Sequence, residues 1–103
     1  MEVAYEDHHL RKLCTDEREM RKKRSDLAPK IKLRIKALET ADTVGELETH
    51  DPLGYWHPLT VDLNGLWSGR LSRNHRILIR PEGGGEAVDA VAVTVVEVGK
   101  DYH

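Results

Sequence analysis

The N-terminal part of the chain combines one short apolar run with two stretches of helical periodicity. Residues 3–5 (Val-Ala-Tyr) predict a first strand. Over residues 7–24, apolar side chains recur at helical spacing and form one narrow stripe of Leu10, Leu13, Cys14 and Met20. A second stripe consists of Leu27, Ile31, Ile35 and Leu38. We expect Ser25 or Asp26 to cap this second helix and Pro29 to lie in its first turn. The pattern therefore predicts a strand followed by a two-helix hairpin.

The second half of the chain changes to short strands separated by turns. Strands are predicted over residues 55–59, 66–71, 75–80 and 88–98. Asn64-Gly65 is a hairpin turn signal, and the Val-rich last run is expected to be the most buried strand. We therefore predict a single domain over residues 1–103 with an α+β fold. In it, the N-terminal strand and the two-helix hairpin pack on one face of a small antiparallel sheet.

The composition is that of a small protein from a reducing compartment. The chain has 103 residues, is 39% hydrophobic and contains no Phe. Its one cysteine, Cys14, allows no intramolecular disulfide. The first residues do not resemble a signal peptide, and no apolar stretch approaches the roughly 18 residues of a membrane span. We expect a cytoplasmic protein without a membrane partner. The six histidines lack paired ligand spacing, so we expect no metal site and no other cofactor.

The formal net charge of −2 is unevenly distributed. Residues 1–36 hold 11 Lys and Arg against 7 Asp and Glu, a net charge of +4. Residues 57–80 hold four Arg and one Asp. In a strand over 75–80, Arg76 and Arg80 face away from the isoleucines, on the sheet face that the helices leave free. Such a face suits a phosphate backbone, although composition alone favours a simple solvated surface with scattered arginines.

Four separated motifs carry a resemblance to a known family. They are Trp56-His57-Pro58-Leu59, residues 62–68 (Asp-Leu-Asn-Gly-Leu-Trp-Ser), Asn74-His75-Arg76-Ile77 and Asp101-Tyr102-His103. In order and spacing they resemble the plasmid-maintenance killer proteins, the HigB branch of the RelE/ParE toxin superfamily. The resemblance covers residues 55–103, and the N-terminal half fits the family's layout of a strand and two helices.

The resemblance implies the toxin of a type II toxin–antitoxin system. Such a toxin is a ribosome-dependent mRNA endonuclease that inhibits translation, and its chemistry is metal-free. The ribose 2′-hydroxyl attacks the adjacent phosphate and leaves a 2′,3′-cyclic phosphate. The implied partners are the ribosome with its mRNA and a helix-turn-helix antitoxin of the HigA type. Operator DNA would be bound only through that antitoxin.

The resemblance also implies the site residues. His57 and His103 match family positions and are expected to share acid and base roles near neutral pH. Arg76 is expected to stabilise the phosphate, while Asp101 and Tyr102 orient His103 or contact the RNA. From their place on the strands, we expect RNA binding by Arg70, Arg73 and Arg80.

Two departures from the family motif leave alternatives open. Thr60 and Val61 stand where the family has Lys and Gly after His-Pro-Leu, and His75 replaces an aromatic residue. A missing lysine removes positive charge from a phosphate site. The alternatives are a non-catalytic ParE-like toxin that inhibits a target such as DNA gyrase by binding, and a weakened member that acts only with its antitoxin.

Overall fold

The computed structural model describes residues 1–60 and 65–101, with Lys100 and Asp101 described by their backbone only. Its strands are β1 (Glu2–Tyr5), β2 (His57–Pro58), β3 (Trp67–Arg70), β4 (His75–Pro81) and β5 (Ala92–Asp101). Its α-helices are α1 (His8–Thr15), α2 (Glu17–Arg24), α3 (Ala28–Thr40) and α4 (Leu47–His50). Short 3-10 segments are η1 (Val44–Glu46), η2 (Pro52–Gly54) and η3 (Ala87–Asp89).

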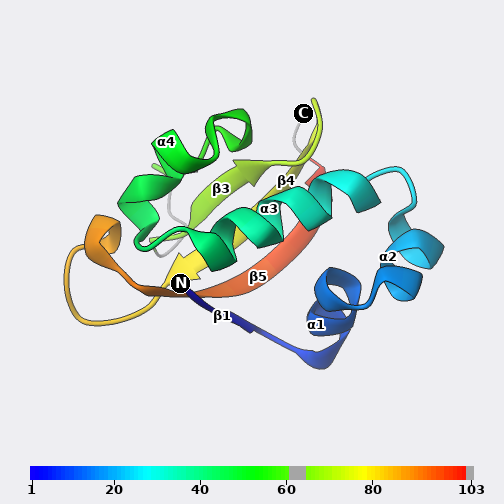
Figure 1. Cartoon of the computed structure of the whole chain (residues 1–103), viewed down its shortest axis with the longest axis horizontal. Helices are drawn as coiled ribbons and strands as arrows, with labels where there is room; N and C mark the ends of the chain where they lie inside the picture. The colour runs from blue at the N-terminus through cyan, green and yellow to red at the C-terminus, as the bar shows by residue number, and fades with distance from the viewer. Residues whose placement is uncertain (61–64, 102–103) are drawn as a thin grey trace.

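The strands form one sheet in the order β1-β5-β4-β3-β2, and the helices cover one of its faces (Figure 1). α3 crosses this face, with α1 and α2 at one end and α4 at the other (Figure 1). Apolar side chains of α3, β4 and β5 fill the core between the layers: Ile31, Ile35, Leu38, Ile77, Ile79, Val93 and Val95. This architecture confirms the predicted α+β class and the buried stripe of the second helix.

The prediction of a wholly antiparallel sheet is wrong in one pairing. β1 runs parallel to β5, with Val3 opposite Val93 and Tyr5 opposite Val95, while the other three pairings are antiparallel. A parallel pair needs a long crossover connection. Here the connection from β1 to β5 consists of the helices on one face of the sheet, followed by β2, β3 and β4.

The predicted helix over residues 7–24 is two helices, because the chain breaks at Asp16. Asp16 has an extended backbone with φ −105° and ψ 109°. Its carboxylate accepts hydrogen bonds from the backbone N–H groups of Arg18 and Glu19, at 3.0 and 3.3 Å. The side chain therefore caps a new helix within a stretch whose apolar spacing continues unchanged.

The predicted cap of the next helix is also wrong. α3 begins at Ala28 and has no side-chain cap, and Leu27 precedes it in the core. Asp26 instead pairs with Arg24 at 3.3 Å, a contact that the apolar pattern cannot indicate. Pro29 does lie in the first turn, as predicted, where its missing N–H costs no hydrogen bond.

Several strands have other bounds than predicted. β2 covers only two residues of the predicted 55–59, and β3 covers Trp67–Arg70 of the predicted 66–71. β5 begins after η3 instead of at residue 88, and it extends to Asp101 instead of residue 98. The predicted turn at Asn64-Gly65 lies partly outside the described residues. Gly65 itself has φ +75°, the left-handed conformation that favours glycine.

Candidate functional site

The sheet face opposite the helices brings together several predicted site residues. The register places His57 opposite Ser68, and Ser68 opposite Leu78. Arg70 lies opposite Arg76 in the neighbouring row. Residues directly opposite each other share a face, so these side chains belong to one surface.

Strand geometry gives the scale of this surface. His57 and Arg76 are separated by two strand spacings and by two residues along the strands, which places their Cα atoms about 12 Å apart. Long side chains can reach one substrate from both positions. The row of His57 also contains Glu97, which lies opposite Leu78 on β5 and which sequence reasoning did not single out. Ser68 and Leu78 are buried, so they form the floor of this face.

The imidazole of His57 has a defined orientation. Its Nδ1 lies 2.7 Å from the backbone carbonyl oxygen of Tyr55. A carbonyl oxygen only accepts hydrogen bonds, so Nδ1 carries a proton in this contact. In the neutral ring, Nε2 is then the basic nitrogen, and His57 is exposed to solvent. The arrangement can therefore accept a proton from a bound hydroxyl.

A buried ionic network holds the segment that carries His57. Arg34 donates from Nη1 to Asp51 Oδ1 at 3.1 Å, and the Trp56 indole donates to Asp51 Oδ2 at 2.9 Å. Arg34 also donates from Nε to the Arg70 carbonyl oxygen at 2.7 Å and from Nη2 to the Leu53 carbonyl oxygen at 3.1 Å. One guanidinium thus ties α3 to the loop before β2 and to β3.

Sequence reasoning missed this network, although it left a signal. Arg34 occupies the i+3 position between Ile31 and Leu38, where the stripe requires an apolar residue. Its side chain is only 4% exposed. A charge at such a position predicts a buried partner, because an unpaired buried charge is strongly unfavourable.

The packing of Trp56 explains a glycine in β3. The indole is 5% exposed and lies against Gly69. A Cβ atom at Gly69 would lie 2.6 Å from the indole ring, closer than real Cβ contacts allow. The chain just before β2 therefore approaches β3 closely through this pair.

The four arginines of the predicted RNA-binding surface differ in their partners. Arg76 donates from Nη1 to the carbonyl oxygens of Ser72 and His75, at 2.8 and 3.1 Å. Among the described residues, no carboxylate pairs with Arg70, Arg73 or Arg76. These three cations retain their charge for a phosphate ligand.

Arg80 is already neutralised. Its guanidinium forms ion pairs with Glu6 at 3.0 Å and Glu82 at 3.2 Å, and hydrogen bonds to these carboxylates raise its pKa. Thr94 donates to Glu82 at 2.6 Å, and this bond together with Arg80 lowers the Glu82 pKa. Arg80 is therefore less available to a phosphate than the other three arginines.

The C-terminal motif is only partly described. The backbone of Asp101 lies opposite His75 at the end of β5, while Tyr102 and His103 lie outside the described residues. The register of β5 shifts at Val96 and again at Gly99, which has φ +81°. Such bulges change the direction of a strand, so Gly99 sets the course of the chain toward Asp101.

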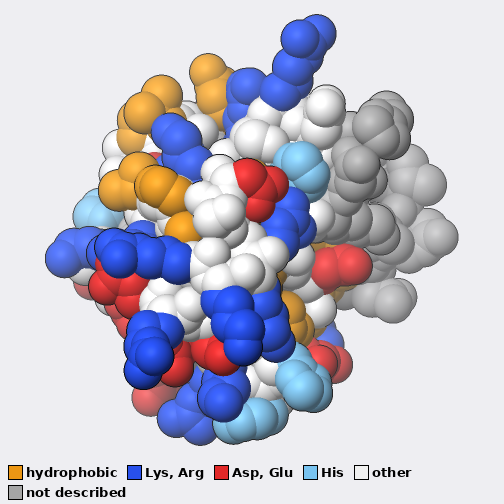
Figure 2. All heavy atoms as spheres, turned by 90° about the vertical axis from the view of Figure 1, so that its right-hand side faces the viewer, with side chains coloured by type: hydrophobic (Ala, Val, Ile, Leu, Met, Phe, Trp, Pro, Cys, Tyr) orange, Lys and Arg blue, Asp and Glu red, His pale blue; other side chains and the backbone are white. Residues whose placement is uncertain are grey.

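A second cationic surface lies on the helices. Figure 2 shows Lys and Arg side chains over much of the end formed by α1 and α2, with acidic side chains between them. Several of the cations are paired: Arg21 and Lys32 with Glu17 at 2.8 and 3.1 Å, and Lys23 with Glu19 at 3.4 Å. These exposed pairs leave fewer unpaired cations at this end of the molecule.

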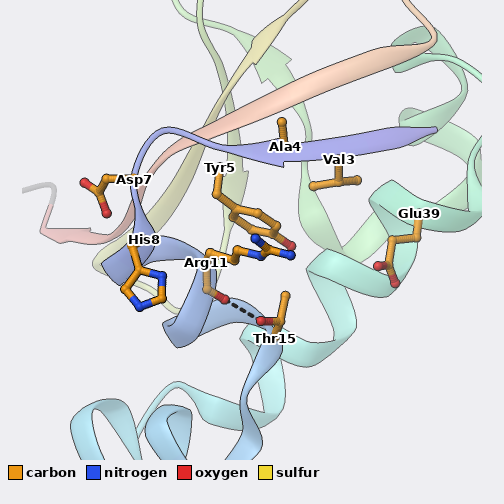
Figure 3. Close-up of a pocket in the computed structure, with 8 residues that line it drawn as sticks. All are labelled: Val3, Ala4, Tyr5, Asp7, His8, Arg11, Thr15 and Glu39. Atoms are coloured by element: carbon orange, nitrogen blue, oxygen red, sulfur yellow. Dashed lines mark hydrogen bonds between the residues drawn. The ribbon is translucent and has the colours of Figure 1, made fainter.

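A hollow of about 610 Å³ lies away from the sheet face that carries His57. β1, α1 and α3 line it, and Figure 3 shows Tyr5 and Arg11 beside each other within it. Burial raises the pKa of the Tyr5 phenol, so this group stays protonated. Among the described residues, no predicted site residue lines this hollow. In the described part of the chain, no three side chains are arranged as metal ligands, and no helix could cross a membrane.

Comparison with known proteins identifies the fold. No protein-family model matches the sequence, and no curated protein matches it significantly. A solved structure of a YoeB/ParE toxin from Agrobacterium tumefaciens aligns with a TM-score of 0.59 at 20% identity, over 99% of this chain and 100% of that one. The YoeB dimer from Staphylococcus aureus aligns with a TM-score of 0.60 at 15% identity, over 99% and 98%.

This chain has the YoeB/ParE toxin fold. The likeness extends over nearly the whole length of each compared chain, so β1, the helices and the sheet all belong to the toxin fold. Within the toxin fold, His57, Arg70 and Arg76 lie on the sheet face opposite the helices. These three side chains thus project from strands of one sheet, and such elements hold side chains more precisely than loops do.

Proposed function

We propose that this chain is the toxin of a type II toxin–antitoxin system and that it cleaves mRNA on the ribosome. The observation that carries the proposal is the sheet face opposite the helices of a toxin fold. On it, an oriented His57 lies beside Arg70 and Arg76, which have no carboxylate partner among the described residues. The HigB-like motifs of the sequence support the same function. The proposed partners are a helix-turn-helix antitoxin of the HigA type, the ribosome and its mRNA, in the cytoplasm.

In the proposed reaction, the ribose 2′-oxygen forms a bond to the adjacent phosphorus and the bond to the 5′-oxygen breaks. His57 Nε2 accepts the proton of the 2′-hydroxyl, and His103 returns a proton to the leaving 5′-oxygen. Arg76 neutralises the charge of the phosphorane, and Arg70 and Arg73 hold the flanking backbone. Asp101 and Tyr102 orient His103 or contact the RNA. The products are a 2′,3′-cyclic phosphate and a 5′-hydroxyl end.

The test is to map RNA 5′ ends in bacterial cells after brief expression of the chain, beside His57→Ala and Arg76→Ala. We expect new cuts within translated codons, and a loss of about 100-fold or more in cutting by each variant. Both variants should remain folded, because neither side chain belongs to the core. Lys36→Ala, on the exposed side of α3, is the control and should cut like the parent.

A second candidate function is inhibition of DNA gyrase by binding. Two observations favour it: Thr60 stands in place of the family lysine, and Arg80 is neutralised by two carboxylates. Growth arrest without new RNA ends, together with loss of supercoiling by purified gyrase in the presence of the chain, would establish this function instead. A toxin weakened in catalysis would show neither effect at low expression.

A further inference from the structure

Tyr55 occupies an unusual position beside the proposed site. Its ring is 60% exposed, although it lies between two hollows of about 270 and 280 Å³. One hollow lies between α3, η2 and β3, and its lining includes Lys30, Leu53 and Arg70. The other includes Pro52 and His57. An exposed aromatic ring thus connects a cationic hollow with the proposed catalytic histidine.

The backbone of Tyr55 is strained. It has φ 46° and ψ 47°, and it is the one described residue other than glycine with a positive φ. This left-handed conformation is unfavourable for a bulky side chain, by about 1–2 kcal/mol. The fold enforces it from both sides, since the Tyr55 N–H donates to Pro52 and the Tyr55 carbonyl accepts from His57. A strained residue that stability alone disfavours is a candidate for function.

The charges that line the first hollow are complementary to a phosphate, whereas Glu48 lines the second. Arg70 Cζ lies 5.7 Å from the centre of the Tyr55 ring, and Lys30 lines the same hollow. Neither cation has a carboxylate partner among the described residues. Among the described residues, no Asp or Glu lines this hollow, and the one further cation in its wall, Arg34, is matched by Asp51.

The walls of the cationic hollow are rigid. Arg34 holds Leu53 in one wall and the backbone of Arg70 in the other, through hydrogen bonds of 3.1 and 2.7 Å. The backbone of Arg70 and of Leu53, on two sides of the hollow, is therefore held in place before any ligand arrives. An aromatic face with adjacent cations is the combination that binds single-stranded nucleic acids, with stacking on the base and charge on the backbone.

We propose that Tyr55, Arg70 and Lys30 form a nucleotide subsite of single-stranded RNA. The base stacks on Tyr55 and the phosphate binds Arg70 and Lys30. The subsite rests on the proposed RNA-cleaving function and adds to it. Because the Tyr55 carbonyl bonds His57, the nucleotide held here flanks the nucleotide that reacts.

The test uses Tyr55→Gly, which removes the ring and also relieves the strain at a positive φ. Binding of a labelled short single-stranded RNA is measured by fluorescence anisotropy at low salt. We expect Tyr55→Gly to raise Kd by about 5-fold to 150-fold while its Tm stays equal or rises. Tyr55→Phe should bind like the parent. Val91→Ala, at an apolar side chain that is 63% exposed on another part of the surface, is the matched control.

An abasic scan separates stacking from a structural effect. One base at a time is removed from the RNA, and the parent should lose affinity when the base that stacks on Tyr55 is missing. Tyr55→Gly should be insensitive to that same removal. If the parent cleaves mRNA in cells and Tyr55→Gly binds and cleaves equally well, the subsite is refuted and the proposed function stands.

Two other outcomes also overturn the subsite. If the parent neither binds RNA nor cleaves mRNA, the proposed function fails and the subsite fails with it. If Tyr55→Gly keeps its RNA affinity but loses the antitoxin that copurifies with the parent, the hollow is a protein contact.

Discussion

Replacing Arg34 with methionine tests how strongly the buried network holds the segment before β2. The Arg34 and Asp51 side chains are 4% and 13% exposed, and their ion pair is 3.1 Å long. Without the guanidinium, the Asp51 carboxylate keeps, within the described part of the chain, only the bond from Trp56 at 2.9 Å. Removing one partner of a buried pair costs about 3–5 kcal/mol, because the other charge stays buried and unpaired.

That loss is large for a protein of this size. Domains are stable by about 5–15 kcal/mol, and 1 kcal/mol corresponds to about 4–8 °C in the Tm of a domain near 100 residues. We therefore expect Arg34→Met to lower the Tm by more than about 12 °C and to shift the urea midpoint accordingly. Arg21→Ala removes an exposed pair with Glu17 and should leave the Tm almost unchanged.

A double-mutant cycle shows whether the loss of stability in Arg34→Met comes from leaving Asp51 unpaired. Combining Arg34→Met with Asp51→Asn removes both charges, so the double variant should be more stable than the sum of the single losses predicts. If Arg34→Met unfolds within about 1 kcal/mol of the parent, the network contributes little. The inference that Arg34 positions His57 and Arg70 would then be wrong.

Three further predictions concern the packing of Trp56, the helix break at Asp16 and the loss of stability at low pH. Gly69→Ala places a Cβ atom 2.6 Å from the Trp56 indole and should destabilise the fold by about 1–3 kcal/mol in urea titrations. Asp16→Ala removes two capping bonds and should cost about 0.5–2 kcal/mol, seen as a lower Tm. Hydrogen bonds, above all the one from Thr94, lower the pKa of Glu82 in the folded state. These bonds therefore contribute their full stabilisation above the pKa that Glu82 has in the unfolded chain, and the stabilisation is lost as the pH falls through the folded-state pKa. Glu82→Gln should therefore show a weaker loss of Tm on acidification than the parent, and an equal loss would contradict this origin.

Sequence periodicity predicts those parts of the fold that depend on one face of one element. The stripe from Leu27 to Leu38 is buried, as the helical spacing requires. The alternation in β4 likewise places Arg76 and Arg80 on one face of the sheet and Ile77 and Ile79 on the other. The break at Asp16 escapes such analysis, because a single carboxylate captures two backbone N–H groups without disturbing the apolar spacing.

Contacts between distant residues could not be predicted from the pattern. Nothing in the sequence of β1 indicates that its partner is β5 or that the two strands run parallel. Arg80 is separated by 74 residues from Glu6, the carboxylate that pairs with it. The prediction of Arg80 as an RNA ligand used only its face on the strand, whereas its availability depends on charges that the fold brings to it.

The network around Arg34 couples stability to the proposed chemistry. β2 has only two residues, so its ladder alone cannot fix the direction of His57. Arg34 and Asp51 supply the missing constraint from α3, through Trp56 and the η2 loop. Substitutions in this network should therefore lower stability and activity together. Tyr55→Gly should separate the two effects. It should lower activity, because the ring that contacts the ligand is lost, and it should leave stability equal or higher, because the backbone strain at Tyr55 is relieved.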